Sequence, residues 1–231
     1  MSTCIKELIQ NMNLVVGCNV GCSYCYARNN TRRFHIIDDF EKPVFFDSKL
    51  KMIDRKKPHN YLLTGMSDLS IWTDEWLNAV FNKMKENPQH QFVFLTKRPD
   101  LLSVETAPDN AWFGVTVTCK SDLWRIDTLR KNVKAKHLHV TFEPLFDDPG
   151  EVDFTGIDWI VIGTMTGAKS KKIKTNPDWA KSLSEQAHEL SIPVFMKEDL
   201  IPIMGEENMI QELPHDFNKV LKEQRTWNNR K

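Results

Sequence analysis

Three cysteines within eight positions are the residues of this 231-residue chain whose types and spacing point most directly to chemistry. Cys18, Cys22 and Cys25 follow an apolar run at residues 13–16, which predicts a short strand leading into their loop. Cysteine thiolates are the usual ligands of iron–sulfur clusters, and a four-iron cluster held by three of them keeps one iron open. Three thiolates in this loop could therefore hold a [4Fe-4S] cluster whose fourth iron binds a small molecule.

Two other interpretations of the loop stay open at this point. A zinc ion could take His35 as its fourth ligand, but zinc sites commonly use two pairs of ligands, and no second pair follows here. A cluster that only carries electrons would need a fourth thiolate near the loop, and none is present. The odd total of five cysteines argues against a secreted disulfide framework and for metal binding in a reducing compartment.

Composition sets broad limits on the kind of protein. The 31 basic and 31 acidic residues cancel, so no global field draws the chain to nucleic acid or to an anionic membrane. No apolar run approaches the roughly 18 residues of a membrane span, and the N-terminus has no apolar signal segment. We expect a cytoplasmic protein with one catalytic domain at residues 1–198 and a C-terminal extension at residues 199–231.

The elements that must position the cysteines follow from the hydrophobic pattern. Apolar, β-branched runs alternate with segments of helical period, as in α/β proteins with a parallel sheet. Helices are expected at residues 74–85, 122–129 and 177–190, the first and last with Thr73 and Asn176 as caps. Strands are expected at residues 13–16, 60–64, 92–95, 112–117, 137–142, 159–162 and 193–196.

Two of these strands have one polar face, although a parallel sheet covered on both sides should be apolar on both. In residues 137–143, Leu138, Val140 and Phe142 alternate with His137, His139, Thr141 and Glu143, and Gly114, Thr116 and Thr118 form a similar face one strand earlier. A polar inner face indicates a lumen. We therefore expect a partial (β/α) barrel of six to seven parallel strands.

The motif C-x3-C-x2-C, with the aromatic Tyr24 before its last cysteine, resembles the defining motif of the radical S-adenosylmethionine (SAM) superfamily. Residues 65–69, 94–99, 112–117, 142–145 and 158–163 resemble a branch of it that phages and mobile elements often encode. The resemblance implies a [4Fe-4S] cluster on Cys18, Cys22 and Cys25 whose open iron binds SAM. It also implies an external electron donor of flavodoxin or ferredoxin type and a 5′-deoxyadenosyl radical that abstracts hydrogen from substrate.

That branch is similar to spore photoproduct lyases, and the similarity assigns further residues. It implies that Ser67, Asp68 and Lys97 bind SAM, with Lys97 as a point charge on the carboxylate, and that Tyr24 packs near the adenine. The hydrogen-donating cysteine of the lyases falls on Gly65, which argues against thymine-dimer repair. Ser67 and Asp68 could instead form a turn or cap a helix.

On the substrate side, we expect Glu143 and Lys197 to face the substrate from the barrel mouth. The structural alternative is an ion pair of Glu143 with Arg98 or Lys197. Cys119, just past the fourth strand, could deliver a hydrogen atom to a product radical or simply be a buried small residue.

Nucleic-acid binding would have to be local. Phosphate contacts are one interpretation of Lys169, Lys171, Lys172 and Lys174, and a solvated loop is the other. Trp72 and Trp124 could stack on bases or fill gaps between helices. The substrate is then a nucleotide, a nucleic acid or another small organic molecule, and a partner protein could complete the site. The competing class is a non-catalytic iron–sulfur or zinc scaffold or redox sensor.

Overall fold

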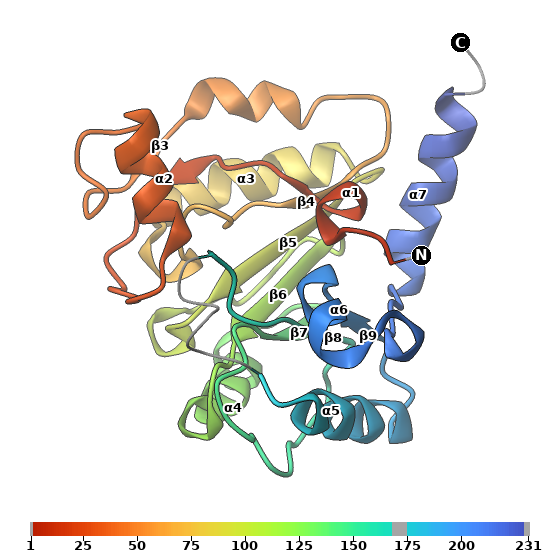
Figure 1. The fold of residues 1–231 in the computed structure, drawn as a ribbon. Coiled ribbons are helices and arrows are strands. Elements are labelled where there is room, and N and C mark those ends of the chain that lie inside the picture. The colour runs from red at the N-terminus through yellow and green to blue at the C-terminus, as the bar shows by residue number, and fades with distance from the viewer. Residues whose placement is uncertain (1, 168–174, 229–231) are drawn as a thin grey trace.

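A seven-stranded parallel sheet forms the centre of the protein, in a computed structural model that describes residues 2–167 and 175–228 (Figure 1). Its strands are neighbours in chain order, and every neighbouring pair is parallel. The sheet curls into an open half-barrel, which confirms the predicted partial (β/α) barrel. The strands are Gln10–Asn11 (β1), Asn60–Leu62 (β4), Gln91–Thr96 (β5), Ala111–Thr116 (β6), His137–Phe142 (β7), Trp159–Ile162 (β8) and Val194–Met196 (β9).

Helices connect the strands, and Asp74–Glu86, Trp124–Asn132 and Pro177–Glu189 pack on the outer side of the sheet (Figure 1). The predicted caps are confirmed, because the side chains of Thr73 and Asn176 accept hydrogen bonds from backbone N–H groups of their helices. No helix within residues 2–167 and 175–228 combines the length and the hydropathy that a membrane span needs. The helices are Ile5–Leu8 (α1), Tyr26–Phe34 (α2), Asp74–Glu86 (α3), Trp124–Asn132 (α4), Pro177–Glu189 (α5), Ile201–Met204 (α6) and His215–Asn228 (α7).

The first predicted strand, at residues 13–16, is wrong as a member of the main sheet. Val15–Val16 (β2) instead pairs antiparallel with Val44–Phe45 (β3) in a separate two-stranded sheet beside the cysteine loop. The edge strand β1 consists of two exposed polar residues, so hydrophobic pattern could not reveal it. Its place is set by backbone pairing with β4.

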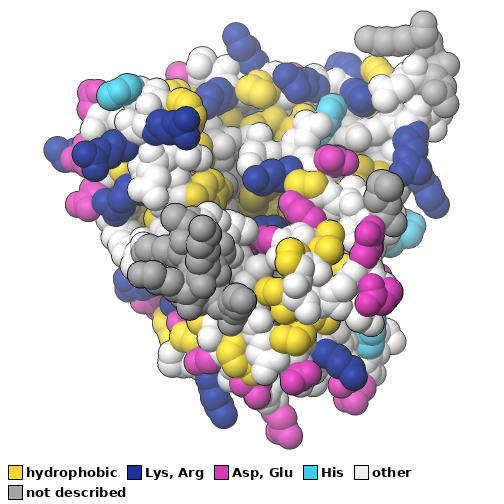
Figure 2. Space-filling model, in the orientation of Figure 1, with side chains coloured by type: hydrophobic (Ala, Val, Ile, Leu, Met, Phe, Trp, Pro, Cys, Tyr) yellow, Lys and Arg dark blue, Asp and Glu magenta, His cyan; other side chains and the backbone are white. Residues whose placement is uncertain are grey.

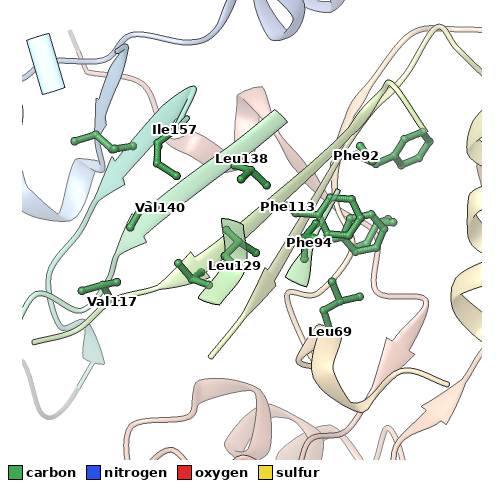
Figure 3. Close-up of a cluster of buried hydrophobic side chains, with 14 of the residues drawn as sticks. Leu69, Phe92, Phe94, Phe113, Val117, Leu129, Leu138, Val140 and Ile157 are labelled. Atoms are coloured by element: carbon green, nitrogen blue, oxygen red, sulfur yellow. The ribbon is translucent and has the colours of Figure 1, made fainter. Parts of the chain in front are cut away.

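The main core lies between the sheet and the outer helices. Phe113, Val115, Leu138 and Val140 point outward from β6 and β7 and are at most 8% exposed, as the alternation predicted. Figure 3 shows side chains of several strands meeting in this layer, with Leu129 of α4 among them. The rings of Phe94 and Phe113 stack with their centroids 5.0 Å apart.

A second apolar cluster fills the inner side of the barrel at the amino ends of the strands. Trp112 and Trp159 project inward, and Phe217 of α7 packs against both rings at 4.7 and 5.3 Å between centroids. The side chain of Asn60 donates to the backbone carbonyls of Leu8 and Phe217, which ties α1 and α7 to the sheet. The barrel therefore has an apolar floor, to which a residue of the C-terminal extension contributes.

His139 lies on the inner face above this floor, next to a strand position that has no side chain. Its ring covers Gly114 so closely that a Cβ on Gly114 would overlap three of the ring atoms. The ring reaches across β6, and its Nε2 lies 3.1 Å from the carbonyl oxygen of Phe94 on β5. The missing side chain at Gly114 thus makes room for a buried polar ring in the lumen.

We predict that Gly114→Ala destabilises the protein by about 1–3 kcal/mol, because the added methyl group overpacks a fixed backbone site. Denaturant unfolding of the variant measures the loss. The double variant Gly114→Ala/His139→Ala removes the ring that clashes, so its stability should match that of His139→Ala alone. Equal destabilisation by Gly114→Ala in both backgrounds would assign the effect to the backbone instead.

Candidate active-site cavity

A cavity of about 490 Å³ opens at the carboxyl ends of the strands. It contains nearly all the residues that the sequence singled out, namely Cys18, Cys22, Tyr24, Cys25, Ser67, Asp68, Lys97, Glu143 and Lys197. Figure 2 shows basic and acidic side chains meeting near the centre of the face that carries α1 and α6. A larger open groove, of about 710 Å³, is lined by none of these residues. Because ligands of such sheets bind at the carboxyl ends of the strands, we take the smaller cavity as the candidate active site.

The three cysteines line one wall of the cavity. Cys25 caps α2, where its Sγ accepts a hydrogen bond from the backbone N–H of Arg28 at 3.4 Å. The Sγ of Cys18 accepts one from the backbone N–H of Val20 at the same distance. Burial raises the pKa of the Cys18 thiol to about 11, so it stays protonated until a metal displaces the proton.

The donor set fits a multi-iron cluster. Within the described part of the chain, no three His, Cys, Asp or Glu side chains are placed to share a single metal ion. A [4Fe-4S] cluster makes no such demand, because each thiolate binds a different iron. Three thiols facing one cavity, with backbone N–H groups on two of the sulfurs, suit that arrangement. His35, the fourth ligand of the zinc interpretation, ends α2 and does not line the cavity.

Asp68 joins the ends of β4 and β5. Its Oδ1 accepts hydrogen bonds from the Thr96 hydroxyl at 2.6 Å and from the backbone and hydroxyl of Ser70, and its Oδ2 accepts one from the backbone N–H of Lys97 at 2.8 Å. The carboxylate is buried and both its oxygens are occupied. The helix-capping alternative for Asp68 is thus present in the structure, and its contacts position Lys97.

Ser67 and Lys97 present their polar groups at this end of the cavity. The Ser67 hydroxyl accepts a hydrogen bond from the Trp72 indole at 3.0 Å, which leaves its own hydrogen to donate. The Lys97 ammonium lies 5.9 Å from the centre of the Tyr24 ring and has no carboxylate partner among residues 2–167 and 175–228. Tyr24 in turn packs edge-on against Phe146. A cation without a salt-bridge partner in the described chain therefore lies beside the cysteine wall.

On the other side of the cavity, Glu143 and Lys197 form an ion pair, which is one of the two pairings that the sequence allowed. Sequence reasoning missed a third member, Asp199, whose Oδ2 lies 3.4 Å from the Lys197 ammonium. Burial by itself lowers the pKa of Lys197, but the charges of Glu143 and Asp199 outweigh it and raise the pKa overall. Lys197 therefore stays charged across the physiological range.

Other sequence-predicted residues lie elsewhere. Cys119 does not line the cavity, and its sulfur lies 3.1 Å from the Ser121 hydroxyl. Trp72 is buried against Phe94, so the gap-filling alternative holds for it, whereas Trp124 is 44% exposed. The four lysines at positions 169, 171, 172 and 174 lie outside the described residues.

His139 is the most deeply buried ionisable residue that lines the cavity, with 1% of its surface exposed. Burial lowers its pKa to about 4, and the hydrogen bond to the Phe94 carbonyl offsets only part of this. The Phe94 oxygen can only accept, so the neutral ring carries its hydrogen on Nε2 and keeps a lone pair on Nδ1. Sequence alternation placed this residue in the lumen but could not show its tautomer.

The same shift predicts an acid-sensitive contribution to stability. Between pH 6.5 and about 4 the unfolded chain binds a proton at position 139 that the folded protein does not, so stability falls as the pH is lowered through this window. We predict that His139→Phe removes roughly 3 kcal/mol of this pH dependence, judged from the difference in unfolding free energy between pH 7 and pH 4. Identical pH profiles for the two proteins would contradict a buried neutral ring.

Known proteins similar to this chain include one family and a group of solved structures. The chain belongs to the family described as "Protein of unknown function (DUF5131)", whose model matches residues 2–229. No curated protein matches this chain. Among solved structures, this chain is similar to a doubly substituted mutant of spore photoproduct lyase with bound AdoMet and dinucleoside spore photoproduct. The two are 11% identical with a TM-score of 0.46, and the match covers 95% of this chain and 73% of the lyase chain. A spore photoproduct lyase complexed with dinucleoside spore photoproduct gives 10% identity, a TM-score of 0.43, and coverage of 94% and 72%.

Proposed function

We propose that the protein is a radical SAM enzyme, with a [4Fe-4S] cluster on Cys18, Cys22 and Cys25. The observation that carries the proposal is that three thiols and Lys97 line one cavity at the carboxyl ends of a parallel half-barrel. Lys97 has no salt-bridge partner in the described chain. When bound, the cluster and SAM supply a 5′-deoxyadenosyl radical by one-electron cleavage of SAM, and this radical abstracts hydrogen from the substrate.

The residues near the cysteine wall are proposed to hold the amino-acid end of SAM. Lys97 offers a positive charge to the carboxylate, and Asp68 fixes the backbone from which Lys97 projects. Ser67 donates its hydroxyl hydrogen to the same end of the ligand. Tyr24 forms part of the wall and is proposed to pack near the adenine. Leu62, Val93 and Val161 make the lower wall apolar, which keeps water away from a reactive intermediate.

The proposed reaction also needs an electron donor and a substrate. An external electron donor of flavodoxin or ferredoxin type reduces the cluster. The substrate is a nucleotide, a nucleic acid or another small organic molecule, bound on the side of the cavity where Glu143 and Lys197 lie. A partner protein that completes the site is part of the same proposal.

We predict that the anaerobically reconstituted protein binds about four irons, absorbs broadly in the visible range, and releases methionine and 5′-deoxyadenosine when given SAM and dithionite. Replacing Cys18, Cys22 and Cys25 together by Ala should abolish the iron, the absorbance and both products. Cys4→Ala is the matched control, because the Cys4 thiol donates a hydrogen bond to Glu198 outside the cavity. This variant should keep the iron, the absorbance and both products. Stoichiometric zinc without iron, or a cluster that yields neither product, would favour the scaffold or sensor class.

We predict that Lys97→Ala weakens SAM binding about tenfold or more while iron content stays unchanged, because a charge-assisted contact to a carboxylate is lost. Ser67→Ala should act in the same direction and more mildly. Calorimetry under argon measures both affinities. Lys85→Ala, an exposed lysine on α3, is the control and should bind SAM as the wild type does. Unchanged affinity in both site variants would contradict the assignment of Ser67 and Lys97.

A further inference from the structure

The inner face of β7 and the residue after it carry three polar side chains in a row, His139, Thr141 and Glu143, and all three line the cavity. We call this row the acceptor column. Each member keeps one polar atom without a hydrogen-bond partner among residues 2–167 and 175–228. Of the three atoms, only that of His139 is fully buried. Such an atom is uncommon, because an unpaired buried acceptor loses its hydration and gains nothing in return.

The individual contacts identify the unpaired atoms. Nδ1 of His139 is buried without a partner in the described chain and carries a lone pair, since Nε2 holds the ring hydrogen. Thr141 is 5% exposed, and its hydroxyl makes no hydrogen bond to a described residue. This hydroxyl is not among the fully buried atoms. Oε1 of Glu143 accepts a hydrogen bond from the Lys197 ammonium, and no described residue bonds to Oε2. Nδ1 of His139 and Oε2 of Glu143 can only accept a hydrogen bond, whereas the Thr141 hydroxyl can accept or donate one.

Glu143 is held rigidly at the upper end of the column. Lys197 binds it from one side and is itself held by Asp199, which accepts a hydrogen bond from the backbone N–H of Thr164 at 3.2 Å. The pair lies against Gly163, where a Cβ would come within 3.0 Å of Lys197 Cδ and 3.1 Å of Glu143 Cγ. The position of the free carboxylate oxygen is therefore fixed before any ligand arrives.

Charge adds to the hydrogen-bonding pattern. The carboxylates of Glu143 and Asp199 both face the ammonium of Lys197, so Glu143 shares this counter-charge with a second carboxylate. Burial raises the pKa of Asp199, and the charge of Lys197 offsets part of this. The complement of a row of acceptors that includes a carboxylate oxygen is a group that donates N–H hydrogens and is positively charged.

We infer that the acceptor column binds the substrate through a protonated amine or amidinium group. The inference rests on the proposed function in taking the molecule bound here to be the substrate of a radical SAM enzyme. Glu143 and Thr141 contact the donor group directly, and the enclosed Nδ1 of His139 lies below them. The substrate class thus named is a cationic nitrogen compound, or a larger molecule that presents such a group.

The test uses the full chain and a matched set of small probes, namely benzylamine, benzyl alcohol and benzoate, which share a ring and differ in charge and donors. Binding is measured by calorimetry without reductant, so the result does not depend on cleavage of SAM. We expect benzylamine to bind at least about tenfold more tightly than benzyl alcohol, and benzoate to bind most weakly. Saturating SAM should leave the affinity for benzylamine within about twofold, because the cofactor occupies the cysteine side of the cavity.

Variants then assign the preference to the column. Glu143→Gln should abolish the advantage of benzylamine over benzyl alcohol. Thr141→Val, which replaces the hydroxyl by a methyl group of similar size, should weaken benzylamine binding by about threefold to tenfold. Glu189→Gln makes the same chemical change at an exposed site on α5 and should bind all probes as the wild type does. Melting temperatures of the variants separate loss of binding from loss of fold.

Several results would overturn the inference. Benzyl alcohol or benzoate binding as tightly as benzylamine would show that the column does not select a cation. A preference that survives both Glu143→Gln and Thr141→Val would place the amine elsewhere. Displacement of benzylamine by SAM would assign the column to the amino group of the cofactor. Failure of the radical SAM proposal is recognised separately, by the absence of 5′-deoxyadenosine and methionine in the cleavage assay.

Discussion

Parallel pairing of the seven strands governs where the functional residues of this protein lie. Because the strands all run in one direction, their carboxyl ends meet at one edge of the sheet, and the segments that leave those ends lie side by side. Residues far apart in the chain, such as Asp68 and Lys97 or Glu143 and Lys197, become neighbours in this way. The candidate functional side chains lie at the carboxyl ends of the strands, while Trp112, Trp159 and Phe217 fill the barrel at the amino ends.

The lumen separates polar from apolar surroundings along its depth. Apolar side chains fill the floor, a neutral histidine lies above them, and the charged groups Asp68, Lys97, Glu143 and Lys197 lie at the level of the strand ends. Burial of a charge costs more free energy the further it lies from water, so ionic groups are stable at the rim and not below it. Within such a cavity, electrostatic contacts with a ligand are stronger than at an open surface.

Two carboxylates at the rim illustrate different uses of the same group. Asp68 has both oxygens occupied by hydrogen bonds from residues 70, 96 and 97, so it organises the loop that presents Lys97. Glu143 is fixed through one oxygen by Lys197, and no described residue bonds to the other. A saturated carboxylate stabilises the scaffold, whereas a half-occupied one in a fixed position can bind a ligand without reorganising.

Local patterns in the sequence were enough to predict the α/β class, six of the seven strands of the sheet, the inner faces of β6 and β7 and the cysteine motif, because periodicity and spacing are local properties. They could not reveal β1, which consists of the polar residues Gln10 and Asn11 and is held only by backbone pairing with β4. They also missed Asp199 and the free atoms of the acceptor column, and they could not separate Cys119 from the cavity. Tertiary structure decided these points, since which polar atoms meet depends on contacts between residues distant in the chain.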